Sequence, residues 1–341
     1  MTRPAPLLFG GLAALAMPVA ARADRSMAYF HTVGPAADPI TRLGWGLGII
    51  SILVIVIIVA LLLGGIFRRR APLSQTSYEQ LAVHRDAGGL SWIYIGVGVS
   101  IPVLIVCMVW TLVTTAAVIH PRVSPTVTID VTASQWWWGL RYDNRDPARV
   151  FTTANEIHIP VGQPVRIELA SADVIHSFWI PKLAGKMDVI PGQTNVMWLQ
   201  ADQPGIYRGQ CAVFCGAEHA RMALQVVAES PGDFVAWQDH QLSVSDAPQS
   251  ALAQQGVTVF ETRCGACHSV RGTGAGGLVG PDLTHLMSRS TLAAGLLPNT
   301  PGNLAGWISS AQALKPGSRM PNLMLAGPEL SAVMAYLDTL R

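Results

Sequence analysis

Two long apolar runs constrain the fold of this chain more than any other feature. Residues 43–67 contain no charged side chain, and residues 90–119 form a second run of the same kind. At about 1.5 Å of rise per helical residue, each run is longer than the roughly 30 Å hydrocarbon core of a bilayer. We therefore expect a transmembrane hairpin, residues 43–119, that leaves the rest of the chain on the side where it began.

Charges between the two runs indicate the orientation of the hairpin. Four arginines lie there, and such clusters favour the cytoplasmic side of a membrane: Arg68, Arg69, Arg70 and Arg85. Residues 1–23 have a basic start, an apolar stretch and a small-residue site, as in a cleavable signal peptide. We expect a two-pass protein of a bacterial inner membrane, with residues 24–42 and everything after the hairpin on the periplasmic side.

Composition excludes one class of partner. The chain has a formal net charge of +2 and only 13% charged residues, so it offers no basic tract for nucleic acid. Its sequence contains no nucleophile with a paired base and no phosphate-binding loop, so we predict no catalytic residues for bond making. Four of the five cysteines form two close pairs after the hairpin, which predicts two local sites.

The residue pattern of the sequence changes after the hairpin. Short β-rich runs punctuated by Gly, Pro and Asp predict an all-β Greek-key sandwich over residues 120–229. A short helix and a polar linker follow at 230–250. Residues 251–341 then show helical periodicity, with one helix over 251–262, another capped by Asn303 and a last one opened by Pro328. The tail is therefore expected to be a small all-α domain.

The first cysteine pair belongs to a set of soft metal ligands. Cys211, Cys215, His219 and Met222 lie within a dozen residues, and His176 is the best source of a second imidazole. Thiolate, thioether and imidazole together favour copper, and two thiolates four residues apart can bridge two copper ions. A disulfide, which the oxidising periplasm permits, and a zinc site are the alternatives.

The second pair lies in a motif for covalent haem. Cys264, Cys267 and His268 form the CxxCH signature, in which two thiols bind the haem and the histidine ligates iron. A redox-active CxxC pair with an unrelated histidine is the alternative. The distal ligand could be one of four methionines, namely Met287, Met320, Met324 and Met334. Met320, in a proline-stiffened loop before the last helix, is the first choice and Met324 the second.

Three segments carry a family resemblance. Residues 173–177, 187–192 and 209–222 resemble the dinuclear copper (CuA) domain of cytochrome c oxidase subunit II, which has a cupredoxin fold. The resemblance implies that His176 and Met222 bind one copper, that His219 and the main-chain carbonyl of Val213 bind the other, and that Cys211 and Cys215 bridge them. It also implies that Trp136, the first residue of a tryptophan run, is the electron entry point.

The tail resembles a class I cytochrome c. Residues 280–283 look like the loop whose proline carbonyl orients the proximal imidazole, and the loop at Met320 looks like the one that supplies the distal ligand. His285, beside the first loop, is expected at the surface or near a haem propionate.

Two features depart from the family. Subunit II commonly has a carboxylate, which helps bind a magnesium or manganese ion, at the position of Val213. Many relatives also have a glutamate near the start of the second membrane helix that admits protons, whereas residues 90–119 contain no acid. Neither a bridging metal nor proton entry is therefore assigned to this chain.

The resemblance implies an electron-input subunit of a respiratory cytochrome c oxidase. Electrons would pass from a donor, either cytochrome c or a quinol:cytochrome c reductase, through one haem c and a two-copper centre to subunit I, which reduces oxygen. Subunit I, subunit III and membrane lipid are the expected partners. The alternatives are the equivalent subunit of a nitric oxide reductase and a membrane-anchored electron carrier or copper-delivery protein without its own oxidase.

Overall fold

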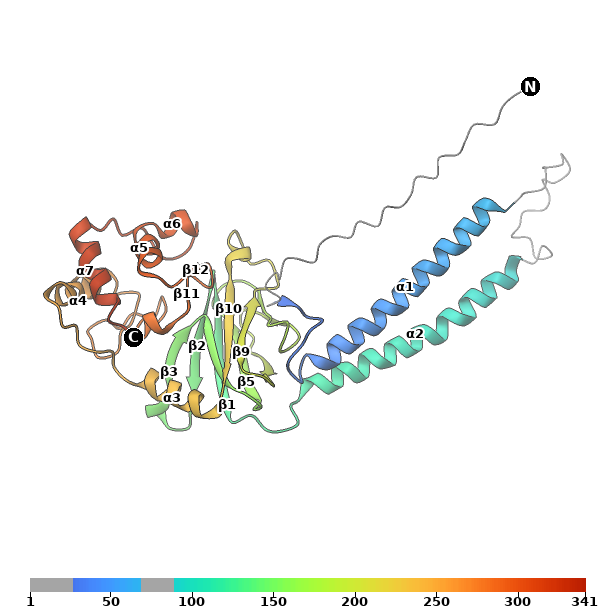
Figure 1. Ribbon diagram of the computed structural model, residues 1–341, viewed down its shortest axis with the longest axis horizontal. Helices are drawn as coiled ribbons and strands as arrows, with labels where there is room; N and C mark the ends of the chain where they lie inside the picture. Colours follow the sequence, from blue (N-terminus) through green and yellow to red (C-terminus); the bar gives the residue numbers. More distant parts are fainter. Residues whose placement is uncertain (1–26, 69–88) are drawn as a thin grey trace, which may run out of the picture.

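The computed structural model describes residues 27–68 and 89–341. The predicted signal peptide and the loop residues Arg69, Arg70 and Arg85 lie outside this range. Figure 1 shows three parts in chain order along the molecule: a helical hairpin, a β-sandwich and a small domain of helices. This arrangement confirms the expected fold class.

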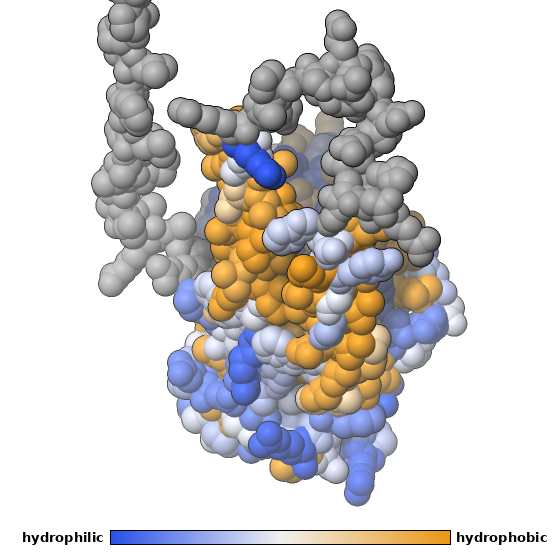
Figure 2. Space-filling model, turned by 90° about the vertical axis from the view of Figure 1, so that its right-hand side faces the viewer, coloured by the Kyte–Doolittle hydropathy of each residue, from blue (hydrophilic) through white to orange (hydrophobic). Residues whose placement is uncertain are grey.

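The hairpin consists of α1 (Asp38–Phe67) and α2 (Gly89–Ile119). Both helices are long and apolar enough to cross a membrane, and Figure 2 shows their hydrophobic surface. A Cβ atom on Gly46 would lie 2.1 Å from the ring of Trp110, so this glycine lets the indole of α2 pack against α1. α1 begins five residues before the apolar run because Asp38, with a proline next to it, suits the first turn of a helix.

The β-sandwich has two main sheets. The larger contains, in spatial order, β3 (Phe151–Ala154), β2 (Trp137–Asp143), β1 (Val127–Ser134), β5 (Val165–Ser171) and β8 (Asn195–Leu199). The smaller contains β4 (Glu156–Pro160), β10 (Ala223–Glu229) and β9 (Gly205–Gln210). A separate ribbon pairs β6 (His176–Phe178) with β7 (Met187–Val189). β1 runs parallel to β5 and β4 runs parallel to β10, while the other pairings are antiparallel.

Alternating side chains explain how the sheets form a core. Ile129 and Val131 of β1 stand beside Ile167 and Leu169 of β5 in register, and all four are buried. The residues between them face outward, as the two-residue period of a strand requires. Each such aliphatic side chain contributes about 1.5–3 kcal/mol when it is fully buried.

The hairpin is fixed to the sandwich at the end where α1 begins and α2 ends. The indole N–H of Trp198 in β8 donates to the carbonyl of Val118 near the end of α2, at 2.9 Å. The segment before α1 also packs on the sandwich, where Val33 N donates to Lys182 O and Val33 O accepts from Asp202 N, both at 2.9 Å. The sandwich therefore stands in a fixed position at the end of the membrane helices.

The remaining α-helices and strands of the described residues are short. They are α3 (Pro231–Leu242), α4 (Ala251–Arg263), the strands β11 (Thr291–Leu292) and β12 (Leu297–Pro298), and the helices α5 (Pro301–Ser309), α6 (Ala311–Leu314) and α7 (Gly327–Leu337). The prediction that Asn303 caps a helix is wrong. Thr300 is the N-cap of α5, and its side chain accepts a hydrogen bond from the Asn303 amide. The sequence offered two capping residues three positions apart, and the first one starts the helix.

α4 and α7 pack together at one glycine. A Cβ atom on Gly256 would lie 2.0 Å from the carbonyl oxygen of Ala332 and 2.7 Å from Cβ of Tyr336. The rings of Phe260 and Tyr336, 5.5 Å apart and edge to face, fill the space beside this contact. The crossing defines the shape of the helical domain, because any side chain at position 256 would force the two helices apart.

Candidate metal and haem sites

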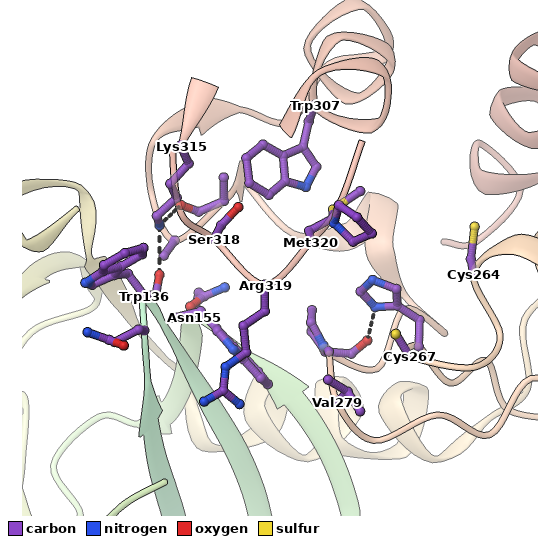
Figure 3. Close-up of a pocket in the computed structure, with 18 of the residues that line it drawn as sticks. Trp136, Asn155, Cys264, Cys267, Val279, Trp307, Lys315, Ser318, Arg319 and Met320 are labelled. Atoms are coloured by element: carbon purple, nitrogen blue, oxygen red, sulfur yellow. Dashed lines mark hydrogen bonds between the residues drawn. The ribbon is translucent and has the colours of Figure 1, made fainter. Parts of the chain in front are cut away.

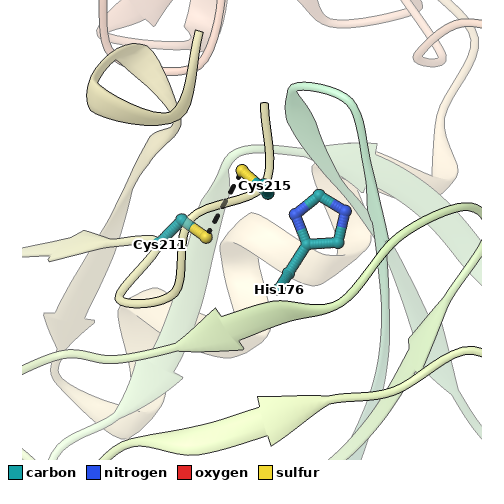
Figure 4. A group of neighbouring side chains, drawn as sticks. All are labelled: His176, Cys211 and Cys215. Atoms are coloured by element: carbon teal, nitrogen blue, oxygen red, sulfur yellow. Dashed lines mark hydrogen bonds between the residues drawn. The ribbon is translucent and has the colours of Figure 1, made fainter. Parts of the chain in front are cut away.

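Three of the predicted copper ligands meet between strands of the sandwich. His176 opens β6, and Cys211 and Cys215 lie in the loop that follows β9, so folding brings together residues 35 positions apart. Their ligand atoms all lie within 4.8 Å of one another (Figure 4). All three side chains are buried, as a closed metal site requires.

The other predicted copper ligands surround the second cysteine and the loop. His219 Nδ1 lies 3.5 Å and Met222 Sδ 3.9 Å from Cys215 Sγ. The carbonyl oxygen of Val213 lies 3.2 Å from Cys211 Sγ. The sequence therefore folds all six predicted donors into one cluster.

The cluster fits a metal better than a disulfide. Cys211 and Cys215 are free thiols with Sγ atoms 3.7 Å apart, whereas a disulfide bond measures about 2.05 Å. Nε2 of His176 bonds to Asp173 Oδ1 at 2.8 Å, and its buried Nδ1 has no hydrogen-bond partner among the described residues. A histidine oriented by a carboxylate with its other nitrogen free is the usual arrangement of a metal ligand.

The two thiols titrate very differently. Interaction with Cys215 lowers the pKa of Cys211 to about 3, although burial opposes this shift, and the His176 ring lowers it further. The pKa of Cys215 is raised, first by the same interaction and then by burial. The pair therefore favours a thiolate on Cys211, and a thiolate is the form that ligates copper.

The CxxCH motif lines a cavity in the helical domain. Cys264 and Cys267 follow the end of α4, and the cavity also contains His268 and Met320. His268 Nδ1 bonds to the carbonyl of Pro281 at 2.8 Å, which leaves Nε2 available for a metal. Burial lowers the pKa of His268, so the imidazole is neutral, as iron ligation requires. A Cβ atom on Gly280 would lie 2.6 Å from the His268 ring, so only glycine leaves room for it.

The four methionines occupy different environments. Met320 lines the cavity, whereas Met324 is 85% exposed and Met287 and Met334 pack against the hydrophobic core. Met320 is thus placed for the predicted role of distal ligand, and Met324 is not.

The prediction that His285 lies at the surface is wrong. This residue is buried, with Nδ1 bonded to the carbonyl of Arg341 at 2.7 Å and Nε2 bonded to that of Ser243 at 3.3 Å. It joins the C-terminus to the linker at 243–250. Its position beside the 280–283 loop could not reveal contacts with segments more than 40 residues away.

The cavity of the CxxCH motif opens onto the sandwich. Gln135, Trp136 and Trp137 line its other side, as Figure 3 shows for Trp136. The Trp136 indole donates to the carbonyl of Cys215 at 3.0 Å, and the Gln135 side chain donates to the same oxygen at 2.7 Å. Trp136 therefore touches the loop of Cys211 and Cys215 and also borders the cavity of the CxxCH motif.

A buried acid–histidine cluster lies under this interface. His158 of β4 lies 3.3 Å from Glu156 and 2.9 Å from Glu229, and its ring stacks on Trp237. Glu156 also accepts hydrogen bonds from the amide and hydroxyl of Ser290 in the helical domain. No pattern in the sequence indicates this contact between residues 134 positions apart.

The cluster predicts a pH dependence of stability. Burial opposes the charged form of His158, but its hydrogen bonds to Glu156 and Glu229 prevail and raise its pKa. Its stabilising contribution is therefore full below the unfolded-state pKa of about 6.5 and is lost as the pH rises through the higher folded-state pKa. Urea unfolding of the full chain at a series of pH values should show this loss, and His158→Gln should remove it. An unchanged profile in the variant would contradict the assignment.

Comparisons with known proteins identify two families in the part of the chain that carries these sites. Residues 140–229 match the family model described as the periplasmic domain of cytochrome c oxidase subunit II, and residues 253–341 match that of cytochrome c. Cytochrome c oxidase subunit 2 of Alkalihalophilus pseudofirmus is 41% identical over 218 residues, which are 63% of this chain and 62% of that protein. The subunit of Bacillus sp. strain PS3 is 31% identical over 228 residues, 63% of each chain.

One solved structure adds a further likeness. The periplasmic domain of subunit II of cytochrome oxidase from Bradyrhizobium japonicum is 29% identical, with a TM-score of 0.33, and the match covers 35% of this chain and 95% of that domain. The chain spans slightly less than two thirds of the length of the two curated relatives above. The chain is therefore similar to cytochrome c oxidase subunit II over residues 140–229 and to cytochrome c over residues 253–341, so that a cytochrome c domain follows the subunit II-like domain in one chain.

Proposed function

We propose that this chain is the electron-input subunit of a respiratory cytochrome c oxidase. Its partners would be subunit I, which reduces oxygen to water, and subunit III. An external cytochrome c or a quinol:cytochrome c reductase would be the donor. The hairpin would anchor the chain in a bacterial inner membrane, with the sandwich (120–229) and the cytochrome c domain (251–341) on the periplasmic side.

The two donor sets would hold different cofactors. His176, Cys211, Val213, Cys215, His219 and Met222 would hold a dinuclear copper centre. Cys264 and Cys267 would bind haem c covalently, with His268 and Met320 as axial ligands. When bound, these groups would act as one-electron carriers whose geometry changes little on oxidation and reduction. Methionine ligation raises the reduction potential of a haem.

A single observation carries the proposal. The cavity that contains the CxxCH motif is closed on one side by Trp136, whose indole bonds to the loop that holds both copper-ligand cysteines. Two redox domains that act independently would not be expected to have one residue in contact with both sites. The chain's own residues therefore keep the two donor sets adjacent, and four of the proposed copper ligands are buried away from water, namely His176, Cys211, Cys215 and Met222.

The cofactor content of the purified full chain tests the proposal. We expect two copper ions by elemental analysis and one covalent haem by the pyridine haemochrome assay. Zinc in the first site, or haem that acid–acetone extraction removes, would contradict it. Copurification with a haem-rich subunit of many membrane spans would distinguish an oxidase subunit from a free electron carrier.

A further inference from the structure

Lys315 occupies an unusual position between the two redox domains. The chain contains three lysines, and Lys315 is the single one in the cytochrome c domain. It follows α6 and is only 2% exposed. Burial lowers its pKa to about 8, against the opposing charge of Glu218, so the side chain is still largely charged at pH 7. A buried ammonium group is costly unless all its protons are bonded.

Three main-chain carbonyls accept the three protons of this ammonium group. Nζ donates to Trp136 O at 2.7 Å, to Arg221 O at 2.8 Å and to Ala293 O at 2.8 Å. Figure 3 shows the bond to Trp136 beside the haem cavity. The first two carbonyls belong to the sandwich and the third to the cytochrome c domain, so one side chain joins the two domains.

The two sandwich carbonyls lie next to the copper-ligand cluster. Trp136 donates from its indole to Cys215 O, and Arg221 directly precedes Met222. Gly317, two residues after Lys315, packs on the Trp136 ring, where a Cβ atom would lie 3.3 Å from Cη2. Lys315 therefore fixes both the residue that borders the haem cavity and the end of the loop that carries the copper ligands.

Neighbouring contacts make the same interface. The Arg221 guanidinium donates to the carbonyl of Leu314 at 2.9 Å, and the amide of Ala223 donates to the carbonyl of Ala294 at 3.0 Å. Each of these hydrogen bonds ends on a main-chain carbonyl. Its strength therefore depends less on salt concentration than that of an exposed ion pair does. The interface is thus built for a fixed arrangement of the two domains.

We propose that Lys315 is a positioning residue that holds the cytochrome c domain docked on the copper-ligand loop, so that electrons pass between the sites within one chain. The inference rests on the proposed function for the cofactors, but the docking itself concerns residues of the apoprotein. Lys315 also lines the cavity of the CxxCH motif, but its ammonium group bonds to three main-chain carbonyls, so we assign it a positioning role and not a catalytic one.

The test compares Lys315→Met with Lys186→Met in the full-length chain. Met keeps most of the volume of Lys315 but leaves three carbonyls without their donor, whereas Lys186 is an exposed lysine of the sandwich. For Lys315→Met we expect amide hydrogen exchange in segments 219–224 and 290–296 to rise at least about tenfold, and haem-to-copper electron equilibration after flash reduction to slow by a similar factor. Lys186→Met should match the wild type in both.

Three further readouts separate positioning from damage to the sites. The copper electron paramagnetic resonance spectrum, the haem absorption spectrum and the rate of haem reduction by a small external reductant should not change in Lys315→Met. Unaltered hydrogen exchange and unaltered equilibration would overturn the inference. If the purified chain binds no copper or haem, the proposed function fails, while hydrogen exchange still decides whether Lys315 docks the domains.

Lys315→Gln keeps the inference testable if the Met variant does not fold. An amide can still donate two hydrogen bonds, although its shorter chain cannot reach all three carbonyls. We expect hydrogen exchange at the same two segments to lie between the wild-type and the Met values. Wild-type exchange in Lys315→Gln would overturn the inference.

Discussion

Replacing Cys211 with serine is expected to eliminate copper binding while leaving the covalent haem in place. Cys211 is buried within 4.8 Å of both His176 and Cys215, and it is the cysteine whose pKa falls to about 3. A serine hydroxyl stays protonated at neutral pH and is a hard donor that copper disfavours. The loss should exceed the roughly 10- to 100-fold drop in affinity that follows removal of a hydrogen bond to a metal ligand. Elemental analysis and the visible spectrum measure the two cofactors separately.

Cys107→Ser is the matched control for this prediction. Cys107 lies on α2 in the hairpin, far along the chain from the donor cluster, and is also a free thiol. The same exchange of sulfur for oxygen should leave both copper ions bound. Full copper content in Cys211→Ser would exclude the thiolate-bridged site, and loss of haem together with copper would indicate misfolding of the chain instead.

The sequence predicted those parts of the structure that depend on local patterns. The apolar runs located α1 and α2 because a membrane span needs an uninterrupted apolar segment. The alternation around Ile129 and Ile167 located two paired strands. The spacing of Cys264, Cys267 and His268 identified the haem motif, because the chemistry fixes that spacing within one turn of chain.

The contacts between domains could not be predicted in this way. Lys315 lies 179 positions from Trp136, and Glu156 lies 134 positions from Ser290. No periodicity or motif links residues so far apart, since the pairing depends on how two finished domains fit together. Lys315 is the single lysine of its domain, but composition alone predicts nothing about whether that lysine is buried.

The choice between two methionines of one loop shows the same limit of prediction from sequence. Met320 and Met324 lie in one short loop, and the sequence ranked them only by likeness to other cytochromes. The structure separates their environments, because Met324 adopts a positive φ of 51° and its side chain is 85% exposed, while Met320 lines the cavity. Such a turn is a property of the folded loop and not of the residue type.

The helical domain gives the last and largest stability prediction, because its two main helices cross without a side chain between them. Gly256→Ala adds one methyl group that would lie 2.0 Å from the carbonyl oxygen of Ala332, and backbone atoms cannot move aside as a flexible side chain can. We expect α4 and α7 to separate and the domain to lose about 3 kcal/mol of stability. Urea unfolding followed through the haem absorption band measures this loss.

Gly306→Ala is the matched control within the same domain. Gly306 lies inside α5, where an added Cβ atom meets nothing within 4 Å. Alanine has a higher helix propensity than glycine, so this variant should gain about 0.5–1 kcal/mol. Opposite signs for one identical substitution at two helical glycines would show that packing at the crossing, and not helix propensity, decides the result. Stabilisation by both substitutions would mean that α4 and α7 do not approach as closely as the structure places them.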